Sequence, residues 1–323
     1  MTSDDPRRIE IHGLSKRFGS VVAVDDLTFS VSSGRVTGFL GPNGAGKTTT
    51  LRMLLGLVRP SAGSATIGGL AYADLADPLH LVGAGLDGSS FHPGRTARDH
   101  LRWVCVAAGV PASRADEVLR LVGLADAADR RVGGYSLGMR QRLSLAGALL
   151  GDPGVLLLDE PANGLDPEGI AWLRGFLRHL AAEGRTVLIS SHVLSEVQQT
   201  VDDVVIIARG RLVHTGPLQG LAGEPGTVVR SPDAALLEPA LLAAGLDASS
   251  RPDGTLVVRG STPTQVGDVA HAAGARLHLL APAEDDLETA FLRMVSEAER
   301  AGEAALHAPV PVLPAGDPTG ATR

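Results

Sequence analysis

The sequence predicts an α/β protein built on a mainly parallel sheet, followed by a small α+β module. Short apolar runs typical of strands alternate with longer segments whose apolar residues recur at helical spacing, as in parallel α/β folds. One of the strands, Arg35–Leu40, runs directly into the glycine-rich segment Gly41–Thr48. Residues 220–226 have the composition of a linker, and beyond them the order of elements changes. We therefore expect one main domain, residues 1–220, and a separate accessory unit.

The strands of the main domain are predicted from runs of apolar and β-branched residues. The runs are Ile9–Leu14, Leu27–Val31, Arg35–Leu40, Leu81–Leu86, Val155–Leu158, Thr186–Ser190, Val204–Ala208 and Leu212–His214. Val155–Leu158 is wholly apolar and lies between Pro153 and Asp159, which is typical of a strand buried on both faces. The last two runs flank Arg209-Gly210-Arg211, which predicts a hairpin.

The helices of the main domain are predicted where apolar residues recur every three or four positions. These segments are Thr48–Val58, Thr96–Ala108, Ala112–Val122, Met139–Leu150 and Gly169–Ala182. Pro60 and Gly63 follow the first of them and mark its end. Because strands and helices alternate, neighbouring strands of the sheet are expected to run parallel.

Residues 227–300 predict an accessory α+β module. Its strands are expected at Thr227–Arg230, Asp247–Ser250, Thr255–Arg259 and Arg276–Leu280, and its helices at Ala234–Ala244 and Thr264–Ala273. That βαββαβ order suits a ferredoxin-like unit. A final amphipathic helix, Glu284–Arg300, is expected to pack on the same module, and residues 301–323, rich in Pro, Gly and Ala, are expected to be disordered.

Composition and charge restrict the classes of function. The net charge of −7 argues against nucleic acid as a partner, because nucleic-acid binding requires a basic face. Cys105 is the only cysteine and lies in an apolar run, so it is interpreted as a packing residue. The N-terminus is polar and acidic, unlike a signal peptide, and no run approaches the roughly 20 apolar residues of a membrane span. We therefore expect a cytoplasmic chain that reaches a membrane only through a partner.

The glycine-rich segment carries the strongest chemical signal in the chain. Gly41-Pro42-Asn43-Gly44-Ala45-Gly46-Lys47-Thr48 matches the phosphate-loop (P-loop) pattern G-x-x-x-x-G-K-S/T, and Thr49 continues the site. Its glycines let backbone N–H groups turn toward an anion, and the following helix adds its dipole. Lys47 is expected to contact the β- and γ-phosphates, and the Thr48 hydroxyl to ligate Mg²⁺. A chance turn is the alternative in a chain with 40 glycines, but the position between a strand and a helix favours ATP and Mg²⁺.

Two later strands end in residues that suit phosphoryl chemistry. Asp159 follows Val155–Leu158 and is expected beside Mg²⁺, directly or through water. Glu160 comes next and is the natural base for an attacking water. His192 follows the strand Thr186–Ser190 and could donate a hydrogen bond to the γ-phosphate, although an ordinary strand-end histidine is the alternative. Lys47, Glu160 and His192 are therefore the predicted catalytic residues.

Two further segments resemble those of ATP-binding cassette (ABC) ATPases. Tyr135–Arg142, with the sequence YSLGMRQR, is similar to the signature segment of that family. Glu160–Pro167 resembles the catalytic glutamate running into the D-loop. The similarity runs in the family's order from about Ile9 to Gly216. It implies a P-loop NTPase of the ABC type, with a nucleotide-binding domain that carries a helical signature subdomain.

The resemblance also implies how the site is completed. In ABC ATPases two cassettes close face to face, and each ATP lies between the phosphate loop of one and the signature of the other. Ser136 and Gly138 would then contact the γ-phosphate across a homodimer of nucleotide-binding domains. Phe18 matches the aromatic residue that stacks on adenine.

The sequence departs from the family pattern at three positions. The signature is usually L-S-G-G-Q, and here Leu137 replaces the first glycine and Met139 the glutamine. Asp87 stands where the family usually has a glutamine, which implies an altered oxygen ligand for Mg²⁺. These departures are similar to those of bacterial drug- and antibiotic-export cassettes of the daunorubicin and bacitracin resistance type. Such cassettes drive a separate integral-membrane permease from the inner face of the membrane.

Two other functions remain open at this point. One is a cassette ATPase that acts on DNA or ribosomes instead of a transporter. Translation-type members carry two cassettes in one chain and DNA-repair members a long coiled-coil insertion, and this sequence has neither feature. The other is a regulatory nucleotide-binding module with little hydrolysis, because of Asp87 and the altered signature. Measured ATP turnover would separate it, since Glu160 predicts hydrolysis.

Overall fold

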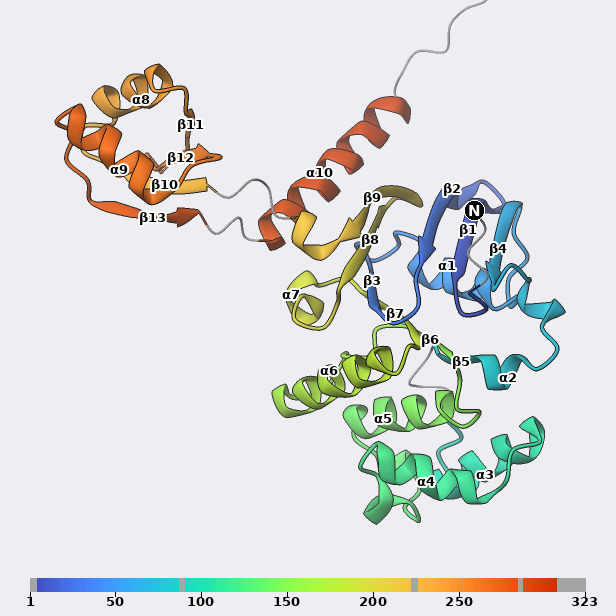
Figure 1. Ribbon diagram of the computed structural model, residues 1–323. Helices are drawn as coiled ribbons and strands as arrows, with labels where there is room; N and C mark the ends of the chain where they lie inside the picture. Colours follow the sequence, from blue (N-terminus) through green and yellow to red (C-terminus); the bar gives the residue numbers. More distant parts are fainter. Residues whose placement is uncertain (1–4, 87–90, 222–225, 252, 284–286, 307–323) are drawn as a thin grey trace, which may run out of the picture.

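A six-stranded sheet forms the centre of the main domain (Figure 1). The computed structural model describes residues 5–86, 91–221, 226–251, 253–283 and 287–306. The strand order of this sheet is β5-β6-β7-β3-β8-β9. Its strands are β3 (Val36–Leu40), β5 (Val82–Gly85), β6 (Val155–Leu158), β7 (Thr186–Ser191), β8 (Asp203–Ala208) and β9 (Arg211–Pro217). All neighbours run parallel except β9, which returns antiparallel to β8, so the predicted parallel α/β class is confirmed.

A second, antiparallel sheet covers one face of the first. It has the order β2-β1-β4 and consists of β1 (Ile9–Phe18), β2 (Val21–Val31) and β4 (Ala62–Ile67). The helix α1 (Lys47–Leu54) contacts β2 and β4, and a core shared by both sheets includes Phe29 and Phe39. α1 ends four residues before the predicted Val58, because Gly56 adopts a left-handed φ of 68°.

Helices pack against the other face of the central sheet. α3 (Ala97–Ala108), α4 (Ser113–Leu121) and α5 (Leu137–Ala148) form a bundle, and α5 also lies along β5 (Figure 1). α6 (Pro167–Ala182) contacts β3 and β7. The short helix α2 (Pro78–Leu81) precedes β5, and the short helix α7 (Leu194–Val197) follows β7. Cys105 is fully buried in the bundle, which confirms its packing role, and burial raises the pKa of its thiol.

The accessory module forms a unit with its own core (Figure 1). Its antiparallel sheet has the order β11-β12-β10-β13. The elements are β10 (Gly226–Arg230), α8 (Ala234–Ala243), β11 (Asp247–Ser250), β12 (Leu256–Arg259), α9 (Pro263–Ala272) and β13 (Leu279–Ala283). The predicted order of elements is confirmed, and the ferredoxin-like classification stays a prediction.

The last strand of the module begins three residues later than predicted. The expected strand started at Arg276, whereas β13 starts at Leu279. Arg276 instead gives its backbone N–H and its guanidinium group to the carboxylate of Asp233, at 2.8–3.0 Å. This ion pair holds residue 276 outside the sheet.

The final helix, α10 (Leu287–Leu306), corrects two predictions. It contacts α7, β8 and β9 of the main domain, so the expectation that it packs on its own module is wrong. Phe291 and Val295 are buried in the main-domain core. The helix also includes residues 301–306, where disorder was expected, and residues 307–323 lie outside the described part. No helix among the described residues is long and apolar enough to cross a membrane.

Candidate functional site

The loop between β3 and α1 has a backbone that only glycine can adopt at key positions. Gly44 and Gly46 have φ angles of 81° and 106°. A Cβ atom at Gly46 would lie 2.6 Å from the carbonyl oxygen of Ala23. The loop lines a cavity of about 240 Å³ together with Thr49 and Glu160. Backbone N–H groups and the first turn of α1 thus surround a space that suits phosphate.

Lys47 places a buried positive charge at this cavity. Its side chain is 6% exposed, and its Nζ donates to the carbonyl oxygens of Gly41 at 2.6 Å and Pro42 at 3.3 Å. The same Nζ lies 3.6 Å from Oε1 of Glu160. Burial lowers the pKa of the Lys47 ammonium group, an effect that Glu160 and Asp159 oppose. An anion in the cavity would favour the charged form further.

The Asp159 carboxylate accepts hydrogen bonds from hydroxyl groups of two other elements, α1 and β7. Thr48 Oγ1 donates to its Oδ2 at 2.6 Å, and Ser190 Oγ donates to its Oδ1. Hydroxyl and carboxylate oxygens are the kind of ligand that Mg²⁺ takes in proteins. The donor set at Thr48 and Asp159 therefore fits a magnesium ion at the phosphate loop.

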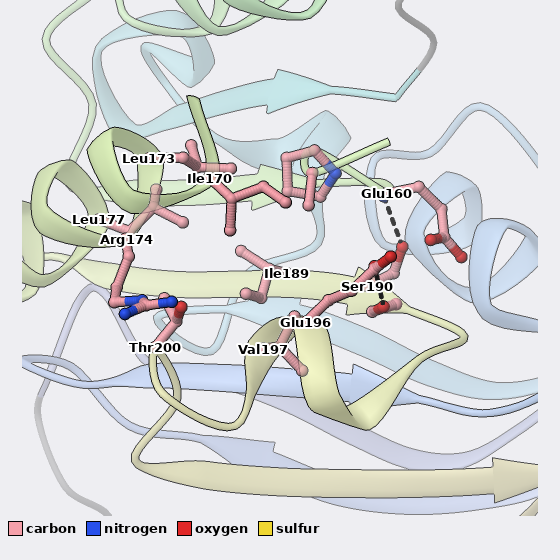
Figure 2. A pocket seen from close by; sticks show the side chains of 13 residues that line it. Glu160, Ile170, Leu173, Arg174, Leu177, Ile189, Ser190, Glu196, Val197 and Thr200 are labelled. Carbon is pink, nitrogen blue, oxygen red and sulfur yellow. Dashed lines mark hydrogen bonds between the residues drawn. The ribbon is translucent and has the colours of Figure 1, made fainter. Parts of the chain in front are cut away.

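Glu160 is held in a strained and well-defined conformation. Its φ of 50° lies in the left-handed region, which costs a non-glycine residue about 1–3 kcal/mol. Its backbone N–H donates to Ser190 Oγ at 2.9 Å, and Figure 2 shows the two residues side by side. Its Oε2 lies 2.9 Å from Nδ1 of His192. The three predicted catalytic residues Lys47, Glu160 and His192 are thus brought together.

The topology explains why residues so distant in sequence meet. β3, β6 and β7 are parallel, so their carboxyl ends lie at one edge of the sheet. The phosphate loop follows β3, Asp159 follows β6, and His192 follows β7. Ser190 belongs to the same edge and joins Asp159 to the backbone of Glu160. Ser190 was not predicted as a site residue, although a serine at the end of a buried strand was a signal.

Phe18 lies at the end of β1, in the hairpin to β2, the strand that the phosphate loop approaches. It pairs with Val21 across the β1–β2 hairpin, and β2 carries the Ala23 carbonyl that Gly46 approaches. The Phe18 ring is 51% exposed, with Lys16 Nζ 4.9 Å from its centroid. An exposed ring in this hairpin is available for stacking on a base.

The two predicted signature residues lie at the start of α5. Ser136 caps α5, and its Oγ accepts a hydrogen bond from the Met139 N–H at 3.2 Å. The described neighbours of Gly138 are Gly164 and Leu165, which lie between β6 and α6 and not in the phosphate loop. Asp87, the predicted Mg²⁺ ligand, lies outside the described residues.

Comparisons with known proteins agree with this geometry. A family model described as ABC transporter matches residues 24–163, and a domain of unknown function (DUF8746) matches residues 225–288. The bacitracin transport ATP-binding protein BcrA of Bacillus licheniformis is 44% identical over 216 residues, 66% of this chain and 71% of the relative. The Nod factor export ATP-binding protein I of Burkholderia lata is 40% identical over 215 residues, 64% of this chain and 70% of the relative. A solved ATP-binding subunit of an ABC transporter is 28% identical, with a TM-score of 0.60, covering 66% of this chain and 91% of that chain.

Proposed function

The chain belongs to the ABC transporter family of ATP-binding cassettes, and from this membership we propose that it is the ATP-hydrolysing subunit of an exporter. One observation carries the assignment of roles within the site. Lys47 and Glu160 line the cavity at the phosphate loop, and His192 contacts Glu160 from outside its lining. A cation, a carboxylate and an imidazole beside an anion cradle are the groups that hydrolysis of a phosphoanhydride requires.

ATP is bound through its phosphates and its base. The backbone N–H groups of residues 43–48 face the β- and γ-phosphates, and Lys47 exchanges its bonds to the Gly41 and Pro42 carbonyls for phosphate oxygens. Phe18 stacks on adenine. Thr48 and Asp159 hold Mg²⁺, and Asp87 adds an oxygen ligand in this proposal. When bound, the metal neutralises charge on the β- and γ-phosphates.

Glu160 and His192 act on the attacking water. The Glu160 carboxylate accepts a proton from the water as the water oxygen forms a bond to the γ-phosphorus. The bond from that phosphorus to the β–γ bridging oxygen breaks, and the products are ADP and inorganic phosphate. His192 holds Glu160 through Nδ1, and its second ring nitrogen donates to the γ-phosphate when the ring carries both protons. Ser190 holds the backbone of Glu160, and His192 contacts its carboxylate.

A second copy of the chain completes each site. Gly138 approaches Gly164 and Leu165 of its own D-loop, and the Ser136 hydroxyl caps α5, which supports a role for both toward the ATP of a partner. They lie at the start of α5, where the helix dipole favours an anion. We therefore propose a homodimer of cassettes that closes on two ATP molecules.

The relatives support a transport role at a membrane. Their names describe bacitracin transport for the 44% identical relative and Nod factor export for the 40% identical one, and on the first of these we propose an antibiotic or drug as cargo. The chain then works with a separate integral-membrane permease, at the cytoplasmic face of the membrane. Two functions compete with this proposal. One is a cassette that acts on DNA or ribosomes, and the other is a regulatory module with little turnover. Stimulation of turnover by membranes containing the permease, and not by DNA or ribosomes, distinguishes them.

Replacing the buried lysine tests the function directly. Lys47→Ala should abolish ATP hydrolysis and weaken binding of a fluorescent ATP analogue by at least about tenfold, because the variant lacks the charge in the cavity. Arg52→Ala is the matched control, since Arg52 is an exposed cation on the same helix. Hydrolysis that survives in Lys47→Ala would refute the proposed function.

A further inference from the structure

The start of the signature helix touches the D-loop of its own chain at one close contact. Leu137, the first residue of α5, lies against Gly164 in the loop between β6 and α6. A Cβ atom at Gly164 would be 2.1 Å from Cδ2 of Leu137 and 2.5 Å from its Cγ. Real Cβ atoms essentially never approach another heavy atom this closely. A side chain at 164 would therefore displace Leu137 from this position, and the φ of 74° at Gly164 would add backbone strain.

This contact is a local fit and not part of a general core. Leu137 is 52% exposed, so one side of its side chain lies on the loop and the other side is open to solvent. Gly138 approaches the same loop, because a Cβ there would lie 3.3 Å from the Gly164 carbonyl oxygen and 3.3 Å from Cδ2 of Leu165. The first turn of α5 thus rests on residues 164–165.

Tight turns connect the D-loop residue Gly164 to Glu160. Asn163 N–H donates to the Glu160 carbonyl at 3.2 Å, and Leu165 N–H donates to the Ala162 carbonyl at 3.1 Å. Gly164 itself has a left-handed φ of 74°. Because successive turns leave little slack between residues 160 and 165, a shift at Gly164 moves the backbone of Glu160.

The opposite side of the loop is less completely packed. Glu160, Pro161 and Ala162 line a small cavity that α6, β7 and α7 close, and Figure 2 shows it with Leu173 and Ile189. Its volume is about 10 Å³, which is near the space that a single water molecule needs. The cavity borders residues 160–162, whereas the contact with Leu137 is at Gly164. Leu137 is therefore one of the contacts that set the position of the loop.

We propose that Leu137 is a positioning residue for hydrolysis, which sets the D-loop through Gly164 and thereby the carboxylate of Glu160. The inference rests on the proposed ATPase function. The glycine usual at this signature position has no side chain and cannot make the contact. In the proposed dimer, α5 faces the ATP bound by the partner, while Glu160 serves the ATP of its own chain. The pair of Leu137 and Gly164 therefore links the two hydrolysis sites.

A double-mutant cycle with Leu137→Ala and Gly164→Ala tests the link. Leu137→Ala should lower kcat on the order of tenfold, which is the size of effect expected when two residues in contact are coupled. The affinity for a fluorescent ATP analogue should change less than about twofold. Gly164→Ala should also lower kcat. The double variant should be more active than the product of the two losses predicts. In that variant the 2.1 and 2.5 Å contacts vanish, and the Cβ of residue 137 stands 3.1 Å from the new Cβ.

A second glycine controls for backbone strain. Gly109 has a φ of 68°, and a Cβ added there would meet nothing within 4 Å, so Gly109→Ala carries the strain of a left-handed alanine without a clash. Gly164→Ala should lose clearly more kcat than Gly109→Ala. Strictly multiplicative losses, or a change in ATP affinity alone, would overturn the inference. An active Leu137→Ala beside an inactive Lys47→Ala would overturn this inference alone, whereas hydrolysis retained by Lys47→Ala would overturn the proposed function as well.

Discussion

The helix α10 should stabilise the ATP-binding domain although it follows the accessory module in sequence. Phe291 is 4% exposed and lies in the main-domain core, beside elements that include α7, β8 and β9. Truncating a buried phenylalanine to alanine costs about 3–5 kcal/mol. In a folding unit of roughly 150–250 residues, each kcal/mol lowers Tm by about 2–4 °C. Phe291→Ala should therefore lower the Tm of the main domain by about 6–20 °C.

Differential scanning calorimetry of the full chain measures this effect, and the next residue provides the control. Leu292 is 55% exposed on the same helix, so Leu292→Ala should change the unfolding free energy by no more than about 0.5 kcal/mol. The accessory module has a core of its own, and its transition should not move in either variant. Equal shifts for Phe291→Ala and Leu292→Ala, or a shift confined to the accessory module, would refute the packing argument.

Two further predictions concern single carboxylates. Glu160→Gln should lower kcat by about 10²–10⁴-fold, because the base that activates water is lost, while ATP still binds. With saturating MgATP this variant should elute as a dimer in gel filtration. A variant that elutes as a monomer would contradict the proposed closure of the dimer. Hydrogen bonds from Arg276 hold the pKa of Asp233 well below its ordinary value of 3.8. A lowered carboxylate pKa stabilises the fold above the unfolded-state pKa, and this contribution is lost as pH falls through the folded-state pKa. The Tm of the accessory module should thus drop as pH falls below about 4, and Asp233→Asn should flatten that part of the profile.

The parts of the site that follow from local sequence were predictable. The phosphate loop is one continuous motif, and its position between a strand and a helix needs no tertiary information. Val155–Leu158 has the bounds predicted for it, because a wholly apolar run between Pro153 and Asp159 leaves little choice. Once the strands were expected to be parallel, their carboxyl ends had to share an edge. The meeting of Asp159, Glu160 and His192 follows from that rule.

The remaining features depend on contacts between distant residues. The pattern of α10 shows that it has an apolar face, but periodicity does not specify which core receives that face. β4 was not expected, since its sequence AGSATI carries few apolar residues, and it forms by pairing with β1. The late start of β13 depends on Arg276 and Asp233, which are 43 positions apart. Tertiary partners decide each of these cases.

Leu137 shows why a departure from a family pattern has to be considered together with its contact. Considered alone, a leucine in place of a signature glycine suggests a weakened site. In the structure its side chain lies against Gly164, in the space that a Cβ atom at that position would occupy. The loop beyond it contains two left-handed residues, Gly164 at φ 74°, which glycine adopts freely, and Glu160 at φ 50°, where the strain persists only because neighbours over-determine the conformation. Ser190 holds the Glu160 end and Leu137 supports the Gly164 end. Removal of either support should let the loop relax and turn the Glu160 carboxylate away, so in our proposal the leucine compensates for the strain of the residue that would activate water.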